Sequence, residues 1–154
     1  MSALAFALPS AQLTPRGLYE TAARELVRFE RPNSVSVDEA ASKRLTALVR
    51  AVAAASDEAR PVSPETFLIA REFLEALPLT ASNPEVSIHP DGDVEFEWFV
   101  RADRVLTISV SSTGETHYAA LIDGRPPTSG RHLFAGTIPA DVADVLAQVA
   151  IPTP

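Results

Sequence analysis

The amino-acid sequence predicts one α+β domain spanning residues 1–154, with helices at both ends and an antiparallel β-meander between them. We expect the N-terminal helices and the C-terminal helix to pack on one face of a four- to five-stranded sheet. Two observations support this architecture. Apolar residues recur at helical spacing in the first half of the chain and alternate with polar residues in the second half. Hydrophobic residues make up 46% of the 154 residues, enough for one buried core.

The helical part is predicted over residues 15–78, after a loosely packed segment at 1–14. Its first helix covers 16–29. The apolar stripe of this helix consists of Leu18, Ala22, Leu26 and Phe29. A second helix begins near Ser36, which forms a capping-box signature with Glu39. The apolar stripe of the second helix consists of Ala41, Leu45, Leu48 and Val52.

The third helix has the clearest start signal. Ser63 is suited to cap it, and Pro64 fits the first helical position, where a backbone N–H would have no partner. Glu65 adds a negative charge at the positive end of the helix dipole. The predicted buried stripe consists of Phe67, Ala70, Leu74 and Leu77. Pro78 then ends the helix.

The β-meander is predicted over residues 84–138, where the hydrophobic period changes to two. Its strands read EVSIH, VEFEWFVR, RVLTISVSS and THYAALI, and HLFAGTI is expected to form a short fifth strand. A closing helix is predicted over 139–149, opened by Pro139. The apolar residues of that helix are Val142, Val145, Leu146 and Val149.

Turn residues set the predicted register of the strands. Three-residue loops are expected at 91–93, 102–104 and 113–115. In the first of them, Gly92 supplies the left-handed conformation that such loops require. The first two loops would place Phe96 opposite Ile88 and Val110. The third would place Val110 opposite Tyr118.

The predicted sheet has one apolar and one polar face. The residues expected to face the helices are Val94, Phe96, Trp98 and Val100. The opposite face carries a row formed by His89, Glu95, Ser111 and His117. This row does not form a catalytic triad, because Ser111 separates Glu95 from His117 and the acid then cannot orient the histidine. No metal site is expected there, since the two histidines lie about 14 Å apart and a third ligand is missing.

The net charge of −7 is concentrated in the second half of the chain. Residues 1–71 carry nine Arg/Lys and eight Asp/Glu, whereas residues 72–154 carry four and twelve, which gives +1 and −8. An acidic half argues against a general nucleic-acid binder and favours a basic protein partner. A nucleic-acid surface on the first two helices is the least favoured interpretation, because acidic residues balance the basic ones. Those basic residues are Arg24, Arg28, Arg31, Lys43 and Arg44.

The leading functional hypothesis is a non-catalytic acidic factor that binds another protein, of the antitoxin, immunity or defence-accessory type. The polar sheet face is its expected binding surface. The expected binding residues are Glu95, Glu97, Phe99 and His117. The alternative is a small-ligand-binding protein or an enzyme that uses an irregular loop at 123–132 to bind an anion. The candidate ligand-binding residues are Arg125, Arg131 and either His132 or His117.

Other classes of site are excluded or disfavoured by composition. The absence of cysteine excludes disulfides and thiolate zinc sites, and it is compatible with a cytoplasmic location. No apolar run approaches the about 20 residues of a membrane span. No nucleotide-binding or hydrolase signature is present, so no cofactor is expected.

Four segments give the chain a resemblance to a loose group of small bacterial proteins. They read LEALPL, NPEVSIHPDGDVEFEWF, LTISVSSTGETHYAALI and IPADVADVLAQV. The chain resembles that group in its leucine–proline helix stop, PDG turn, EW strand, meander and proline-started last helix. The resemblance covers roughly residues 66–149, and the PDG…E-W segment is its most specific part. It implies the helix-plus-meander fold, and it implies no activity, cofactor or site.

Overall fold

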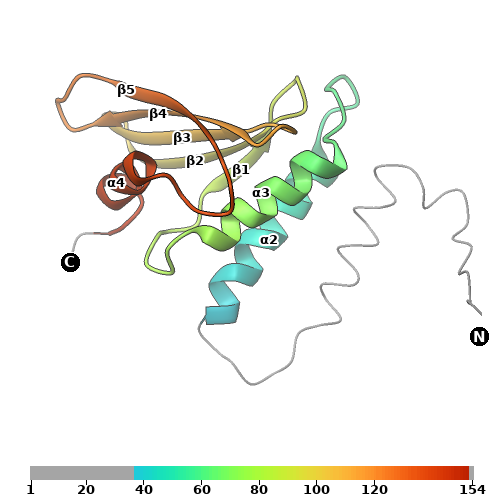
Figure 1. The fold of residues 1–154 in the computed structure, drawn as a ribbon, viewed down its shortest axis with the longest axis horizontal. Helices are drawn as coiled ribbons and strands as arrows, with labels where there is room; N and C mark the ends of the chain where they lie inside the picture. Colours follow the sequence, from blue (N-terminus) through green and yellow to red (C-terminus); the bar gives the residue numbers. More distant parts are fainter. Residues whose placement is uncertain (1–36, 153–154) are drawn as a thin grey trace, which may run out of the picture.

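The computed structural model describes residues 37–152 and has the predicted α+β fold (Figure 1). In chain order its elements are α2 (Val37–Ala54), α3 (Pro64–Ala76), β1 (Glu85–Ile88), β2 (Val94–Arg101), β3 (Arg104–Val110), β4 (Glu115–Ile122), β5 (Thr128–Leu133) and α4 (Ala140–Val149). The strands form one antiparallel sheet in the order β1-β2-β3-β4-β5, which is a meander. The helix predicted at 16–29 and the segment 1–14 lie outside the described residues.

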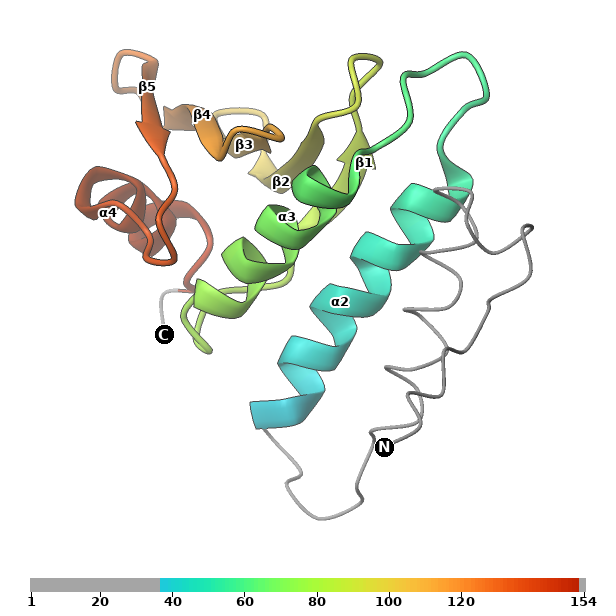
Figure 2. The ribbon, with the colours of Figure 1, turned by 45° about the vertical axis from the view of Figure 1, so that its right-hand side comes forward.

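The described helices α2, α3 and α4 all lie on the same side of the sheet (Figure 2). α2 contacts β1, α3 contacts β2 and β3, and α4 contacts β3 and β4. We call the other side of the sheet the outer face, and none of these three helices covers it. Among residues 37–152, no helix combines the length and the hydropathy needed to cross a membrane.

The start of α3 confirms the sequence prediction. The Oγ atom of Ser63 accepts a hydrogen bond from the backbone N–H of Thr66 at 3.0 Å, and Pro64 is the first helical residue. The predicted stripe of α3 is buried: Phe67, Ala70, Leu74 and Leu77. α4 begins directly after Pro139. Its predicted apolar residues are also buried: Val142, Val145, Leu146 and Val149.

Arg44 does not belong to a basic surface patch, contrary to the sequence prediction, because it is only 2% exposed. From α2 its guanidinium donates hydrogen bonds to Leu77 O at 3.4 Å, Pro78 O at 3.0 Å and Ala81 O at 2.7 Å. Leu77 is the C-cap of α3, and Pro78 and Ala81 belong to the segment that follows the helix, so the arginine ties this segment to α2. Burial lowers the pKa of the Arg44 guanidinium.

The strand register differs from the predicted one by two residues at each of the first three pairings. Phe96 pairs with Val86 and Ile108, and Ile108 pairs with Tyr118. A shift of two residues leaves each side chain on its predicted face, because side chains alternate with a period of two. Apart from Val100, apolar alternation therefore predicts the faces of these strands correctly and their pairing incorrectly.

The turns account for the difference in register. Gly92 and Gly114 are the last residues of their three-residue loops rather than the central ones, with φ of 93° and 80°. Between β2 and β3 a two-residue connection replaces the expected loop, and a bulge lies between Phe99 and Arg101. The bulge leaves Val100 51% exposed, so the prediction that Val100 faces the helices is wrong.

β5 begins earlier in the chain than predicted. Asp123 and Gly124 have φ of 27° and 69° and form a tight turn, and the chain is back in the sheet at Thr128. The stretch 123–132 is therefore not one irregular loop, as predicted, because its second half belongs to β5.

The predicted fifth strand at 132–138 overlaps β5 only at its first two residues. Phe134 turns into the core instead, where its ring packs edge-on against Phe73 with 5.4 Å between centroids. The Phe73 ring also stacks on Phe96, again with 5.4 Å between centroids. This aromatic cluster joins α3, β2 and the segment that follows β5.

Candidate functional site

Side chains of the outer face form rows that run across the strands, and three of these rows hold the predicted binding residues and their neighbours. The first row consists of Ser87, Glu95, Ser109, His117 and Arg131. The second row consists of Glu85, Glu97, Thr107, Ala119 and Ser129. The third row consists of Phe99, Val105 and Leu121. Directly paired residues point to the same side of a sheet, so each row is a set of neighbours.

The four residues predicted to bind a protein lie together on the outer face. They are Glu95, Glu97, Phe99 and His117. Between Glu95 and His117 lies Ser109, because the register shift moves Ser111 to a neighbouring row. A serine in this position still keeps the acid from orienting the histidine, so the row does not have the geometry of a Ser–His–acid triad.

Three carboxylates gather where β1 meets β2, and we call them the acidic corner: Glu85, Glu95 and Glu97. Glu85 lies directly opposite Glu97, and like charges in such a pair destabilise a sheet. Within residues 37–152, none of the three carboxylates takes part in an ion pair. Glu85 was not among the predicted binding residues, because the predicted register did not place it beside Glu97.

The β4–β5 side of the outer face is electrically balanced. The Oε1 atom of Glu115 lies 3.1 Å from Nε of Arg131 and 3.4 Å from Nε2 of His117. The carboxylate thus has one permanent cation beside it and one that is charged when protonated. Within the three rows, the carboxylates without a counter-ion are therefore those of the acidic corner.

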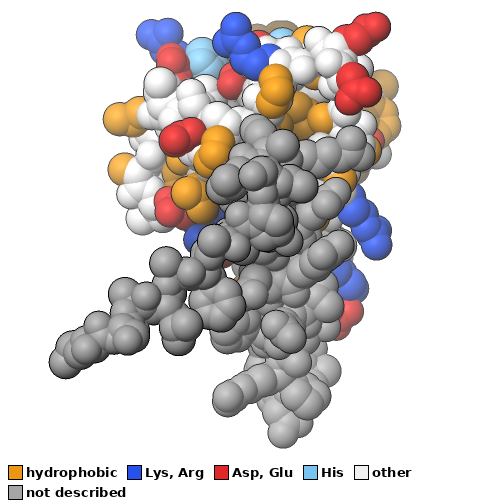
Figure 3. Space-filling view, turned by 90° about the vertical axis from the view of Figure 1, so that its right-hand side faces the viewer, with side chains coloured by type: hydrophobic (Ala, Val, Ile, Leu, Met, Phe, Trp, Pro, Cys, Tyr) orange, Lys and Arg blue, Asp and Glu red, His pale blue; other side chains and the backbone are white. Residues whose placement is uncertain are grey.

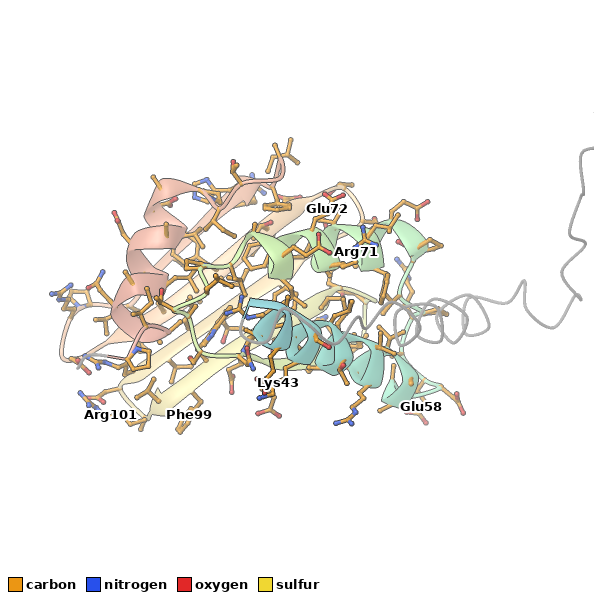
Figure 4. The ribbon with its side chains drawn as sticks, turned by 90° about the horizontal axis from the view of Figure 1, so that it is seen from below. Lys43, Glu58, Arg71, Glu72, Phe99 and Arg101 are labelled. Atoms are coloured by element: carbon orange, nitrogen blue, oxygen red, sulfur yellow. The ribbon has the colours of Figure 1, made fainter. Side chains whose placement is uncertain are left out.

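The third row is apolar, and we call it the apolar strip: Phe99 and Leu121 are exposed, and Val105 between them is half-buried. Phe99 is 65% exposed and Leu121 is 39% exposed. Figure 4 shows Phe99 beside Arg101 at the end of β2. There Arg101 and Arg104 both bind the carboxylate of Asp123, so the charges next to the strip are paired. Exposed apolar side chains side by side are typical of a binding surface.

The residues of the alternative ligand site are only partly brought together. Arg131 lies on the outer face, where it pairs directly with His117, whereas Arg125 donates from Nη1 to Oε1 of Gln148 on α4 at 2.6 Å. His132 follows Arg131 in β5, so its side chain points to the opposite face. The alternative function, a small-ligand-binding protein or an enzyme, stays a prediction.

His132 instead joins a cluster that ties α4 to the sheet. Its Nε2 atom lies 2.6 Å from Oδ2 of Asp141, which also accepts a hydrogen bond from the Tyr118 hydroxyl at 3.1 Å. The rings of Tyr118 and His132 are stacked, with 6.2 Å between centroids. The Tyr118 ring lies over Gly130, where a Cβ atom would come within 2.5 Å of Cε1.

The electrostatics of this cluster favour a charged aspartate and a neutral tyrosine. Burial raises the pKa of Asp141, but hydrogen bonds from His132 and Tyr118 outweigh burial and hold that pKa below its ordinary value. Burial and the bond to Asp141 raise the pKa of Tyr118. Because Asp141 lies in the first turn of α4, we interpret the cluster as a clasp between α4 and the strands β4 and β5.

The histidines of the described residues do not assemble a metal centre. His89 pairs through Nδ1 with Asp91 at 2.8 Å, not with Glu95 as the predicted register implied. Among residues 37–152, no group of three or more His, Cys, Asp or Glu side chains is arranged to hold a metal ion.

Comparisons with known proteins give no match to any family model, curated protein or solved structure. The resemblance to small bacterial proteins therefore stays a prediction. On the side of the molecule shown in Figure 3, acidic and basic side chains of the described residues are intermingled with hydrophobic ones. The acidic corner and the adjoining apolar strip are the features of the described surface that best fit a binding site.

Proposed function

We propose that this protein is a non-catalytic factor that binds a basic partner protein through the outer face of its sheet. The observation that carries the proposal is the acidic corner, whose carboxylates have no counter-ion among residues 37–152, beside the exposed apolar strip. We assign it to the antitoxin, immunity or defence-accessory type of subunit, acting in the cytoplasm.

The two parts of this surface support different aspects of binding. Complementary charge raises the association rate and rejects wrong partners, more than it adds affinity. An exposed aromatic side chain such as Phe99 supplies the apolar area that becomes buried at the centre of an interface. A surface with both parts suits a partner that is basic and carries apolar anchors.

The proposal is tested by capture from the native cell with three baits. The outer variant combines Glu85→Gln, Glu95→Gln and Glu97→Gln. The control variant combines Asp57→Asn, Glu58→Gln and Glu72→Gln, three exposed acids outside the sheet, of which Glu58 and Glu72 are labelled in Figure 4. Each variant changes the net charge from −7 to −4, so the two differ only in where the charge is removed.

We expect the wild type and the control variant to retain the same basic protein in stoichiometric amount, and the outer variant to lose it. Raising the salt concentration should release that protein, because exposed charges are screened. Equal retention by the outer and control variants would refute the proposed surface. The purified partner would then give the affinity of each variant directly.

A further inference from the structure

We infer that the partner presents an amphipathic α-helix that lies along β2 and β3, with basic side chains over the acidic corner and apolar side chains over the apolar strip. This inference rests on the proposed function and specifies the kind of segment that fits the outer face.

The occupant of a sheet face must satisfy its own backbone hydrogen bonds. The outer face offers side chains only, because the backbone groups of its central strands β2, β3 and β4 are used in the sheet. An extended segment laid over them would leave buried N–H and C=O groups unpaired, at a cost for each group. A helix has no such cost, and strand addition would use an edge strand rather than this face.

Side-chain size places the helix over β3. The residues of β3 on the outer face are short near its centre, Thr107 and Ser109, whereas β2 carries Glu95 and Glu97 beside them. A helix above the short residues can rest close to the sheet. Its long basic side chains can then extend sideways to the carboxylates of β2.

The spacing of the rows matches the spacing of a helix. Successive rows on one face of a strand are about 6.7 Å apart, and residues one turn apart on a helix are separated by about 6 Å. From Phe99 the carboxylates of Glu97 and Glu95 lie one and two rows away. A helix with an apolar anchor and two basic residues at successive one-turn intervals therefore covers all three.

The helix dipole sets the direction of this helix. The N-terminal end of a helix carries partial positive charge, which favours a position near the acidic corner. The basic residues of the partner helix should therefore precede its apolar anchor in sequence.

A second copy of this chain is a poor occupant. Each copy has a net charge of −7 and the same acidic corner, and a two-fold interface brings identical surfaces together. The charge complementarity of the face thus points to a basic partner.

The inference is tested by titrating the full chain with synthetic peptides and following backbone amide signals by NMR. The probe is an alanine-based peptide of about 18 residues, long enough to form a helix, with two arginine pairs one turn apart followed by a leucine pair. A second peptide has the same residues in reverse order. A third carries a central proline, which breaks the helix and leaves the charges in place.

We expect the probe to shift the amide signals of Glu95, Glu97, Thr107 and Ser109, and to bind about tenfold more tightly than the proline peptide. The reversed peptide should bind more weakly than the probe. Equal binding of the probe and the proline peptide at the outer face would overturn the helix and leave the proposed function intact. Binding that maps elsewhere, or no binding of any peptide, would overturn both. Shifts at the outer face that appear with rising protein concentration alone would identify a second copy and overturn the inference.

Discussion

The two faces of the sheet differ in whether their polar groups have partners. On the helix side, the indole N–H of Trp98 donates to Ser82 O at 2.8 Å, and the buried guanidinium of Arg44 donates to backbone carbonyls of the segment that follows α3. On the outer face, Glu85 and Glu97 stand opposite each other without a counter-ion among residues 37–152. The helix side is thus arranged for stability, and the outer face carries charge that does not stabilise the fold.

We therefore expect the helix side of the sheet to determine stability and the outer face to determine binding. Substitutions on the helix side should reduce the free energy of unfolding, because they leave buried polar groups unpaired or disturb packing. Substitutions in the acidic corner should leave that free energy unchanged or raise it, while reducing binding to a cationic partner.

The largest loss of stability is expected for Arg44→Met. Methionine fills much of the space but leaves the carbonyls of Leu77 and Ala81 without donors, at a cost of about 3 kcal/mol in total, whereas the Pro78 carbonyl keeps the backbone N–H of Ala81. Urea unfolding measures the change. Lys43→Met is the neighbouring control, since the Lys43–Glu39 pair is exposed and should contribute little to stability. An Arg44→Met protein as stable as the wild type would contradict the role assigned to Arg44.

A smaller loss is expected for Gly130→Ala, at about 2 kcal/mol. The added methyl would come within 2.5 Å of Cε1 of Tyr118, so the ring must move and its bond to Asp141 weakens. Thermal unfolding gives the comparison with Ser129→Ala, which changes an exposed neighbour on the outer face. If both variants unfold at the same temperature, the close packing of Tyr118 on Gly130 does not matter for stability.

The clasp should also make stability depend on pH. The pKa of Asp141 is lower in the folded protein than in the unfolded chain, so its contribution is present above the unfolded pKa of about 4 and is lost as pH falls through the folded pKa. The stability difference between wild type and Asp141→Asn should therefore be larger at about pH 5 than at about pH 3. A difference that stays constant between these pH values would show that Asp141 is not charged in the clasp.

The smallest expected effect is a gain in stability rather than a loss. Glu97→Gln removes a like-charge contact with Glu85, so the free energy of unfolding should rise by about 0.5 kcal/mol. Glu72→Gln on α3, an exposed position without an ion pair among residues 37–152, should change it less. Destabilisation by Glu97→Gln would mean that the carboxylate has a structural role on the outer face.

Local signals in the sequence predicted the fold class and the faces of the sheet. The cap at Ser63 and the burial of Phe96 follow from residue type and period, which depend on short-range physics. The residues Glu95, Glu97, Phe99 and His117 were placed on one face correctly for the same reason.

The register and the buried arginine could not be predicted in this way. A shift of two residues preserves every face, so only the detailed turn geometry at Gly92 and Gly114 distinguishes the true pairing. That pairing is what adds Glu85 to the acidic corner. Arg44 finds its partners more than thirty residues away along the chain, and nothing in its neighbouring sequence indicates burial.

The most direct test of the account is the affinity of the arginine–leucine helical probe for the outer variant and for the control variant, measured by calorimetry at low salt. Each surface ion pair contributes about 0.5 kcal/mol, so loss of three should weaken binding about tenfold in the outer variant. The control variant, with the same net charge, should stay within about twofold of the wild type. Equal affinities of the two variants would mean that the probe responds to overall charge, and that the outer face is not the binding surface.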